Sequence, residues 1–144
     1  MPDDDEISPY AMLAEPSEEI NQLSRRVIGI CIGIHRALGA GLPEEAYEEA
    51  LSMEFDVQGI RYERQYRIPI LYKGRCVARV RLDFLIDSML VLEAKSVDAL
   101  TPIDRRQVLR YLEVTKLPLG LLVNFNVVLL KEGIRRIIRS EPIS

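Results

Sequence analysis

The stretch that decides the fold is Val80-Arg-Leu-Asp-Phe-Leu-Ile-Asp-Ser-Met-Leu-Val-Leu-Glu-Ala-Lys-Ser96. Its pattern predicts two apolar β-strands joined by a tight turn. Asp83 lies in the first strand, while Glu93 and Lys95 lie in the second, where strand alternation puts them on one face. Unpaired charge inside an apolar sheet is costly, so these groups need a reason to be there. One reason is a divalent cation held by Asp83 and Glu93, with Lys95 beside the water that the cation activates.

The pairing register of the two strands decides whether this arrangement is feasible. If Ile86 pairs with Leu90 across a three-residue loop, Asp83 lies opposite Glu93 on the same face. If Ile86 pairs instead with Met89 across a two-residue loop, the register slips by one residue and Glu93 falls on the other face. The metal hypothesis therefore requires the three-residue loop or an equivalent bulge.

Length and composition indicate an ordinary globular protein. The 144 residues are 48% hydrophobic and 28% charged, which fits one domain with a sizeable core. No apolar run reaches the roughly 18 residues that would span a bilayer, and the acidic N-terminus is unlike a secretory signal. We therefore expect a cytoplasmic protein with no membrane partner. Residues 1–16 are predicted to be an acidic, flexible leader, and residues 17–144 a single domain.

The side chains that could hold a soft metal are few. Cys31 and Cys76 lie in apolar contexts and are predicted to be reduced core thiols. With two cysteines and one histidine, no zinc site of standard spacing can be written. Any metal should be a hard cation bound by oxygen atoms.

Basic residues gather between residues 61 and 81, where Glu63 is the only acid. Such a run fits a solvated strand face or the binding of a phosphate backbone, and the sequence favours neither. Its basic members are Arg61, Arg64, Arg67, Lys73, Arg75, Arg79 and Arg81.

Periodicity and turn signals predict the other elements. Helices are expected from Ser17 to about residue 38, from Pro43 to about residue 57, and from Thr101 to about residue 114. Strands are expected over 61–72, 76–86, 89–96 and 117–125, with the first three antiparallel and the last parallel to the third. Residues 127–138 fit either two short strands or a strand and a helix.

The second predicted helix carries four glutamates. Glu45, Glu48 and Glu49 are expected to face solvent, and Glu44 by itself fits a first-turn glutamate favoured by the helix dipole.

Six separated motifs occur in an order that resembles a known family. They are Ile34-His35-Arg36-Ala37-Leu38-Gly39, Gly41-Leu-Pro-Glu44-Glu-Ala-Tyr47, Asp83, Glu93-Ala94-Lys95, Gln107-Val-Leu-Arg-Tyr111 and Leu119-Gly-Leu-Leu-Val-Asn-Phe125. The set resembles the GxxExxY family of the PD-(D/E)XK nuclease-like superfamily over about residues 20–139. The resemblance implies an α/β (α+β) restriction-endonuclease-like core: a mixed β-sheet flanked by helices in the order α-α-β-β-β-α-β.

The resemblance also implies roles for particular residues. Asp83, Glu93, Glu44 and the Ala94 carbonyl would bind Mg²⁺ (or Mn²⁺), and Lys95 would orient or help deprotonate the attacking water. Gln107 would complete the catalytic set. Tyr47, Tyr111, Arg79 and Arg81 are the expected substrate-binding residues. His35 also matches a family position, although packing or capping explains it at least as well as catalysis.

The leading hypothesis is a magnesium-dependent nuclease that acts on DNA or, with less support, on RNA. The first alternative is a catalytically silent nuclease-like domain that binds nucleic acid or a partner protein. The second is a buried ion network in which Lys95 bridges Asp83 and Glu93, which ranks last because such networks often cost more stability than they return. A homodimer is compatible with a double-stranded substrate, since one small domain offers one active site.

Overall fold

The computed structural model describes residues 15–139. Its helices and strands follow the predicted order α-α-β-β-β-α-β, and one further strand is added at an edge of the sheet. The elements are α2 (Glu18–Leu38), α3 (Glu44–Gln58), β1 (Tyr62–Tyr72), β2 (Arg75–Ile86), β3 (Leu90–Lys95), α4 (Pro102–Thr115), β4 (Leu119–Asn124), the short 3₁₀ helix η2 (Leu130–Gly133) and β5 (Ile134–Ile138).

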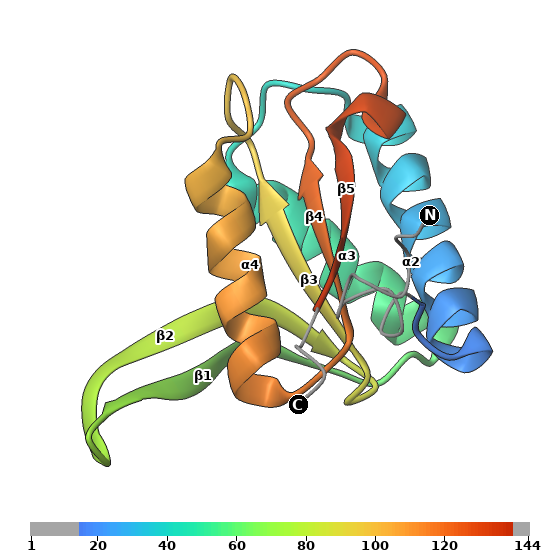
Figure 1. The fold of residues 1–144 in the computed structure, drawn as a ribbon. Coiled ribbons are helices and arrows are strands. Elements are labelled where there is room, and N and C mark those ends of the chain that lie inside the picture. Colours follow the sequence, from blue (N-terminus) through green and yellow to red (C-terminus); the bar gives the residue numbers. More distant parts are fainter. Residues whose placement is uncertain (1–14, 140–144) are drawn as a thin grey trace, which may run out of the picture.

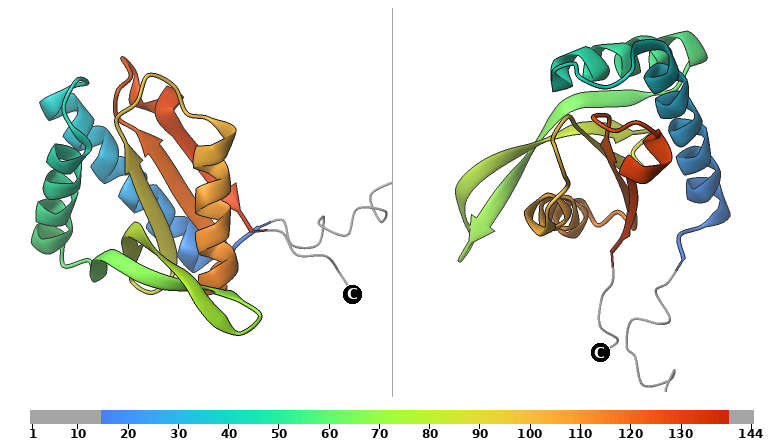
Figure 2. Two further views of the ribbon diagram at one scale, coloured as in Figure 1. Left: turned by 90° about the vertical axis from the view of Figure 1, so that its left-hand side faces the viewer. Right: turned by 90° about the horizontal axis from the view of Figure 1, so that it is seen from above.

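The five strands form one mixed sheet in the order β1-β2-β3-β4-β5. All neighbours are antiparallel except β3 and β4, which run parallel on either side of the α4 crossover. Helices α2 and α3 cover one face of this sheet, and α4 covers the other (Figures 1 and 2). The predicted α+β class and strand directions are confirmed.

Each face of the sheet has its own apolar core. The core between the sheet and helices α2 and α3 contains residues such as Val27, Leu51, Phe55, Phe84, Leu92 and Leu121. The α4 side is filled by residues such as Val108, Leu112, Leu85, Val91 and Leu122. Because β3 and β4 contribute to both cores, they read as continuous apolar runs in the sequence.

The helix ends use the predicted signals. The Ser17 hydroxyl accepts the Ile20 N–H at 3.3 Å, and Gly59 ends α3 in the left-handed conformation with φ 70°. Thr101 and Asp104 form a reciprocal capping box at the start of α4. None of the described helices is long and apolar enough to cross a membrane.

The β1–β2 hairpin extends well beyond the rest of the sheet (Figure 1). Strand β2 pairs with β3 only at Phe84, Leu85 and Ile86, so its remaining residues pair with β1 alone. The turn between the two strands lies at Lys73 and Gly74, with φ values of 51° and 78°. Pro69 lies in the edge strand β1, where a residue without an N–H is tolerated, next to a register shift at Ile70 and Leu71.

One prediction about the cysteines needs correction. Cys76 is exposed on the hairpin, whereas Cys31 is buried as expected; both are free. For residues 127–138 the sequence left open two short strands or a strand and a helix. The structure has a loop, the 3₁₀ helix η2 and then the single strand β5. Within the predicted leader, residues 1–14 lie outside the described part of the chain, and Glu15 forms an ion pair with Arg136 at 3.1 Å.

Candidate functional site

The register of β2 and β3 brings Asp83 and Glu93 together. Ile86 pairs with Leu90 across a three-residue loop, as the metal hypothesis requires. The Asp83 N–H donates to Glu93 Oε1 at 3.0 Å, and the Ala94 N–H donates to Asp83 Oδ2 at 2.9 Å. These side-chain contacts lie just beyond the last regular pair of the ladder. The two carboxylates therefore meet where β2 begins to separate from β3.

Burial dominates the electrostatics of this pair. It raises the pKa of Asp83 to about 6, an effect that the Ala94 N–H opposes and the charge of Glu48 reinforces. Burial and then the charge of Asp83 raise the pKa of Glu93 to about 8, while Lys95 acts in the opposite direction. Two neighbouring carboxylates that resist ionisation in this way would be stabilised as anions by a cation.

Lys95 connects the pair to helix α4. Its Nζ lies 3.8 Å from Glu93 Oε2 and donates to Gln107 Oε1 at 3.1 Å. It also lies 3.9 Å from Asp104 Oδ1, although Asp104 was not among the site residues expected from the sequence. The i, i+3 spacing of Asp104 and Gln107 was the available signal, since it places both on one helix face.

Helix α3 contributes two glutamates. Glu44 Oε2 accepts a long hydrogen bond of 3.5 Å from the Ser96 N–H. Glu48, predicted to face solvent, is instead 6% exposed; its Oε1 accepts from Gln65 Nε2 at 2.7 Å and lies 3.6 Å from Arg64 Nε. That prediction was wrong because Glu48 is one turn from Glu44 and shares its inward face. The i, i+4 spacing indicated the shared face but not its burial.

A hollow of about 720 Å³ lies between α3 and the base of the hairpin. Acidic and basic groups line it together, so both a cation and a phosphate could be accommodated by charge. Arg81 is on this wall, whereas Arg79 is exposed further along β2. The lining residues are Glu44, Glu45, Glu48, Arg64, Gln65, Arg81, Asp83 and Ser96.

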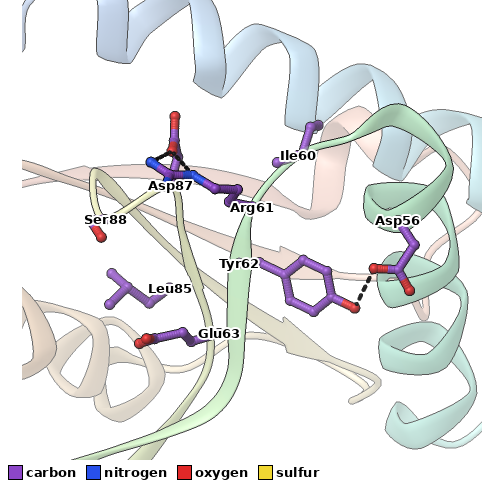
Figure 3. A pocket seen from close by; sticks show the side chains of 8 residues that line it. All are labelled: Asp56, Ile60, Arg61, Tyr62, Glu63, Leu85, Asp87 and Ser88. Atoms are coloured by element: carbon purple, nitrogen blue, oxygen red, sulfur yellow. Dashed lines mark hydrogen bonds and ion pairs between the residues drawn. The ribbon is translucent and has the colours of Figure 1, made fainter.

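A second hollow of about 600 Å³ lies at the opposite end of β3 (Figure 3). There Arg61 binds Asp87 at 3.1 Å and the Tyr62 hydroxyl donates to Asp56 at 3.0 Å. None of the predicted site residues lines this hollow, and its polar groups largely satisfy one another.

Three residues of the predicted motifs are buried in structural roles. The Tyr47 hydroxyl donates to the Gly39 carbonyl at 2.6 Å, and its ring stacks on Phe125 with centroids 4.5 Å apart. The Tyr111 hydroxyl donates to the Arg81 carbonyl at 2.9 Å. A His35 ring nitrogen lies 2.8 Å from the Val127 carbonyl. Substrate contact by Tyr47 or Tyr111 stays a prediction, and neither ring offers exposed surface for it.

The donor atoms fit a hard divalent cation by type. One carboxylate oxygen of Asp83 and one of Glu93 accepts a hydrogen bond from a backbone N–H. The other oxygen of each carboxylate remains able to bind a cation. Magnesium keeps several waters, so two carboxylates and a carbonyl would suffice. Within residues 15–139, however, no three acidic, histidine or cysteine side chains form a metal-binding group. Metal ligation by Asp83, Glu93, Glu44 and the Ala94 carbonyl therefore stays a prediction.

Comparisons with known proteins place this geometry in context. A solved structure, titled "Crystal structure of SSO0001", matches at 20% identity with a TM-score of 0.47, over 69% of this chain. The aligned part is half of that chain, and a likeness at this level carries no functional argument. A search of curated proteins gave no match.

A family model supplies the stronger result. The model described as "PD-(D/E)XK nuclease superfamily" matches residues 21–137, which include every predicted site residue. The narrower resemblance to the GxxExxY family stays a prediction. The mixed sheet with helices on both faces is consistent with the restriction-endonuclease-like fold that the resemblance implied. With its fold and most of its length accounted for, this chain belongs to the PD-(D/E)XK nuclease superfamily.

Proposed function

We propose that this protein is a nuclease that uses Mg²⁺ or Mn²⁺ to hydrolyse phosphodiester bonds in DNA, with RNA the less favoured substrate. The observation that carries the proposal is the Asp83 and Glu93 pair, joined by two backbone hydrogen bonds, with the Lys95 ammonium 3.8 Å from Glu93. Superfamily membership supports a nuclease in general. The metal, the substrate and the residue roles are our inference.

The side chains would divide the work as follows. Asp83, Glu93, the Ala94 carbonyl and Glu44 would hold the cation, which when bound would neutralise charge on the phosphoryl oxygens. Lys95 would orient the attacking water and hold or return a proton at its Nζ. Gln107 fixes the Lys95 ammonium through their 3.1 Å hydrogen bond. Arg81, on the wall of the hollow, would bind a neighbouring phosphate.

Cleavage assays test the proposal directly. Purified protein is incubated with supercoiled plasmid, linear duplex, single-stranded DNA and RNA, in Mg²⁺, Mn²⁺ or EDTA. We expect metal-dependent cleavage that Lys95→Ala lowers by about 10²–10⁴-fold, as for loss of a general acid–base group. Lys131→Ala is the matched control, since Lys131 is exposed on η2. Equal rates for wild type and Lys95→Ala, or cleavage in EDTA, would contradict the proposed mechanism.

A metal-binding measurement separates this function from the silent domain. The silent interpretation is favoured because no group of three possible metal ligands forms in the described chain, and because backbone hydrogen bonds already take one oxygen of each carboxylate. Calorimetric titration with Mn²⁺ should give one site that Asp83→Asn abolishes. Salt-dependent nucleic-acid binding without metal uptake or cleavage would support the silent domain instead.

The homodimer and the cytoplasmic location stay predictions from the sequence. Light scattering during size-exclusion chromatography, with and without duplex DNA, tests the first.

A further inference from the structure

The outer part of the hairpin is a two-stranded ribbon with one uncovered face. Residues 66–72 of β1 and 75–82 of β2 pair with each other and with no third strand. On one face, Tyr66, Ile68 and Val80 pack toward the α4 core. A lone two-stranded ribbon is only marginally stable, so this packing is what holds it in place.

Three arginines occupy the opposite face. The register places Arg67 directly across from Arg81, and Pro69 across from Arg79. Since cross-strand partners and alternate residues share a face, Arg67, Arg79 and Arg81 point away from Ile68 and Val80. All three are exposed. Like charges placed directly opposite each other destabilise a sheet, so the Arg67–Arg81 pair costs stability in the free protein.

Residues 66–82 contain no carboxylate of their own. The sequence has no acidic residue between Glu63 and Asp83. Among the described residues, none of these arginines forms an ion pair, and neither do Lys73 and Arg75 at the tip. By contrast, Arg64 at the base binds Glu49 at 2.9 Å. The uncompensated charge matches a ligand with regularly spaced negative charges.

We propose that the arginine face of residues 66–82 is a docking arm for the phosphate backbone of double-stranded nucleic acid. A two-stranded β-ribbon fits the major groove of a duplex, and guanidinium groups bind phosphates in pairs of hydrogen bonds. Binding sites for single strands add aromatic rings on which bases stack. The arginine face has none: Tyr66 packs toward α4, and Tyr72 lies at the tip beside Lys73, whose Nζ is 5.5 Å from its ring centroid.

The arm leads to the candidate active site. Arg81 belongs both to the arginine face and to the wall of the hollow that contains Asp83. A nucleic-acid backbone bound along Arg79 and Arg81 therefore continues toward Asp83, one member of the carboxylate pair. The choice of nucleic acid as ligand rests on the proposed nuclease function, but binding by the arm requires no metal and no cleavage.

Binding is measured in EDTA by fluorescence anisotropy, so that the result does not depend on catalysis. The probes are a labelled 20-base-pair duplex and one of its single strands, titrated at several KCl concentrations. The test variant is Arg67→Gln/Arg79→Gln. The control is Arg36→Gln/Lys131→Gln, which makes the same charge change at exposed residues on α2 and η2. Circular dichroism checks that each variant is folded.

We expect wild type and control to bind the duplex alike and more tightly than the single strand. The test variant should bind about tenfold more weakly, and its plot of log affinity against log salt should be shallower by about 1.8, or 0.9 per lost phosphate contact. If the double variant does not fold, Arg79→Gln alone should give half of that change in slope. Equal binding by test and control variants would overturn the inference, and tighter binding to the single strand would overturn the duplex assignment. Arm-dependent binding without any cleavage in Mn²⁺ would retain the arm and remove the nuclease proposal.

Discussion

Replacing Glu93 by glutamine should stabilise the metal-free protein at alkaline pH. Glu93 is 4% exposed, and burial together with the charge of Asp83 raises its pKa from 4.5 to about 8. Between these values the unfolded chain releases a proton that the folded chain retains, so stability falls as pH rises through this window. Below it Glu93 is neutral in both states and adds no pH dependence.

The size of the effect follows from the pKa. Each unit of difference is worth 1.36 kcal/mol, so the full shift from 4.5 to about 8 corresponds to about 5 kcal/mol. Glutamine carries no charge, so the variant avoids both the cost of burying the Glu93 carboxylate and its repulsion by Asp83. Glutamine still accepts the Asp83 N–H through its side-chain oxygen. We therefore expect Glu93→Gln to raise the free energy of unfolding by about 3–5 kcal/mol at pH 8.5.

Urea denaturation followed by circular dichroism measures this quantity at pH 5, 7 and 8.5 in EDTA. The control is Glu113→Gln, because Glu113 is exposed on α4 and its ion pair with Arg106 should contribute less than about 1 kcal/mol. The stability gain of Glu93→Gln should grow steadily with pH, while the control stays flat. A gain that is absent at pH 8.5, or equal at all three pH values, would refute the reasoning.

Three further predictions concern the fold that positions the site. Gly120→Ala should lower stability by about 1–3 kcal/mol in urea melts, because its Cβ would lie 2.7 Å from Val108 Cγ1, and Val108→Ala should restore part of the loss. Tyr47→Phe should cost about 1–3 kcal/mol by the same measurement, since the Gly39 carbonyl loses its 2.6 Å donor; an unchanged midpoint would show that this bond is dispensable. Thr101→Ala removes the capping box and should lower the free energy of unfolding by about 1 kcal/mol, which thermal melts show as a lower midpoint temperature. Thr101→Ser should leave the midpoint unchanged.

Local sequence signals predicted most of the secondary structure. Ser17 and Thr101 each begin a helix, because their side-chain oxygens accept a hydrogen bond from a backbone N–H of the first turn. Gly59 ends a helix because it adopts the left-handed conformation. These signals are readable because each depends on atoms within a few residues of the chain. Residues 127–138 carry no such signal, and their 3₁₀ helix and edge strand depend on packing against β4.

The candidate site was predictable in its parts but not in its assembly. The sequence alone allowed two registers for β2 and β3, and the three-residue loop with φ values of 51° at Asp87 and 55° at Ser88 selects one of them. Glu48 was misassigned because burial of a helix face depends on which strands the helix packs against. Periodicity shows that two residues share a face, but it does not show what that face meets.

The amino-acid sequence determined the elements from α2 to β4, their order, and which charged residues lie inside apolar strands. Those properties arise from short-range hydrogen bonds, steric preferences and the periods of helix and strand. The tertiary structure decided which of the charges meet: Asp83 with Glu93, Lys95 with Gln107, and Glu48 with Gln65. Each of these contacts joins residues at least ten positions apart, so only the docking of whole elements could establish them.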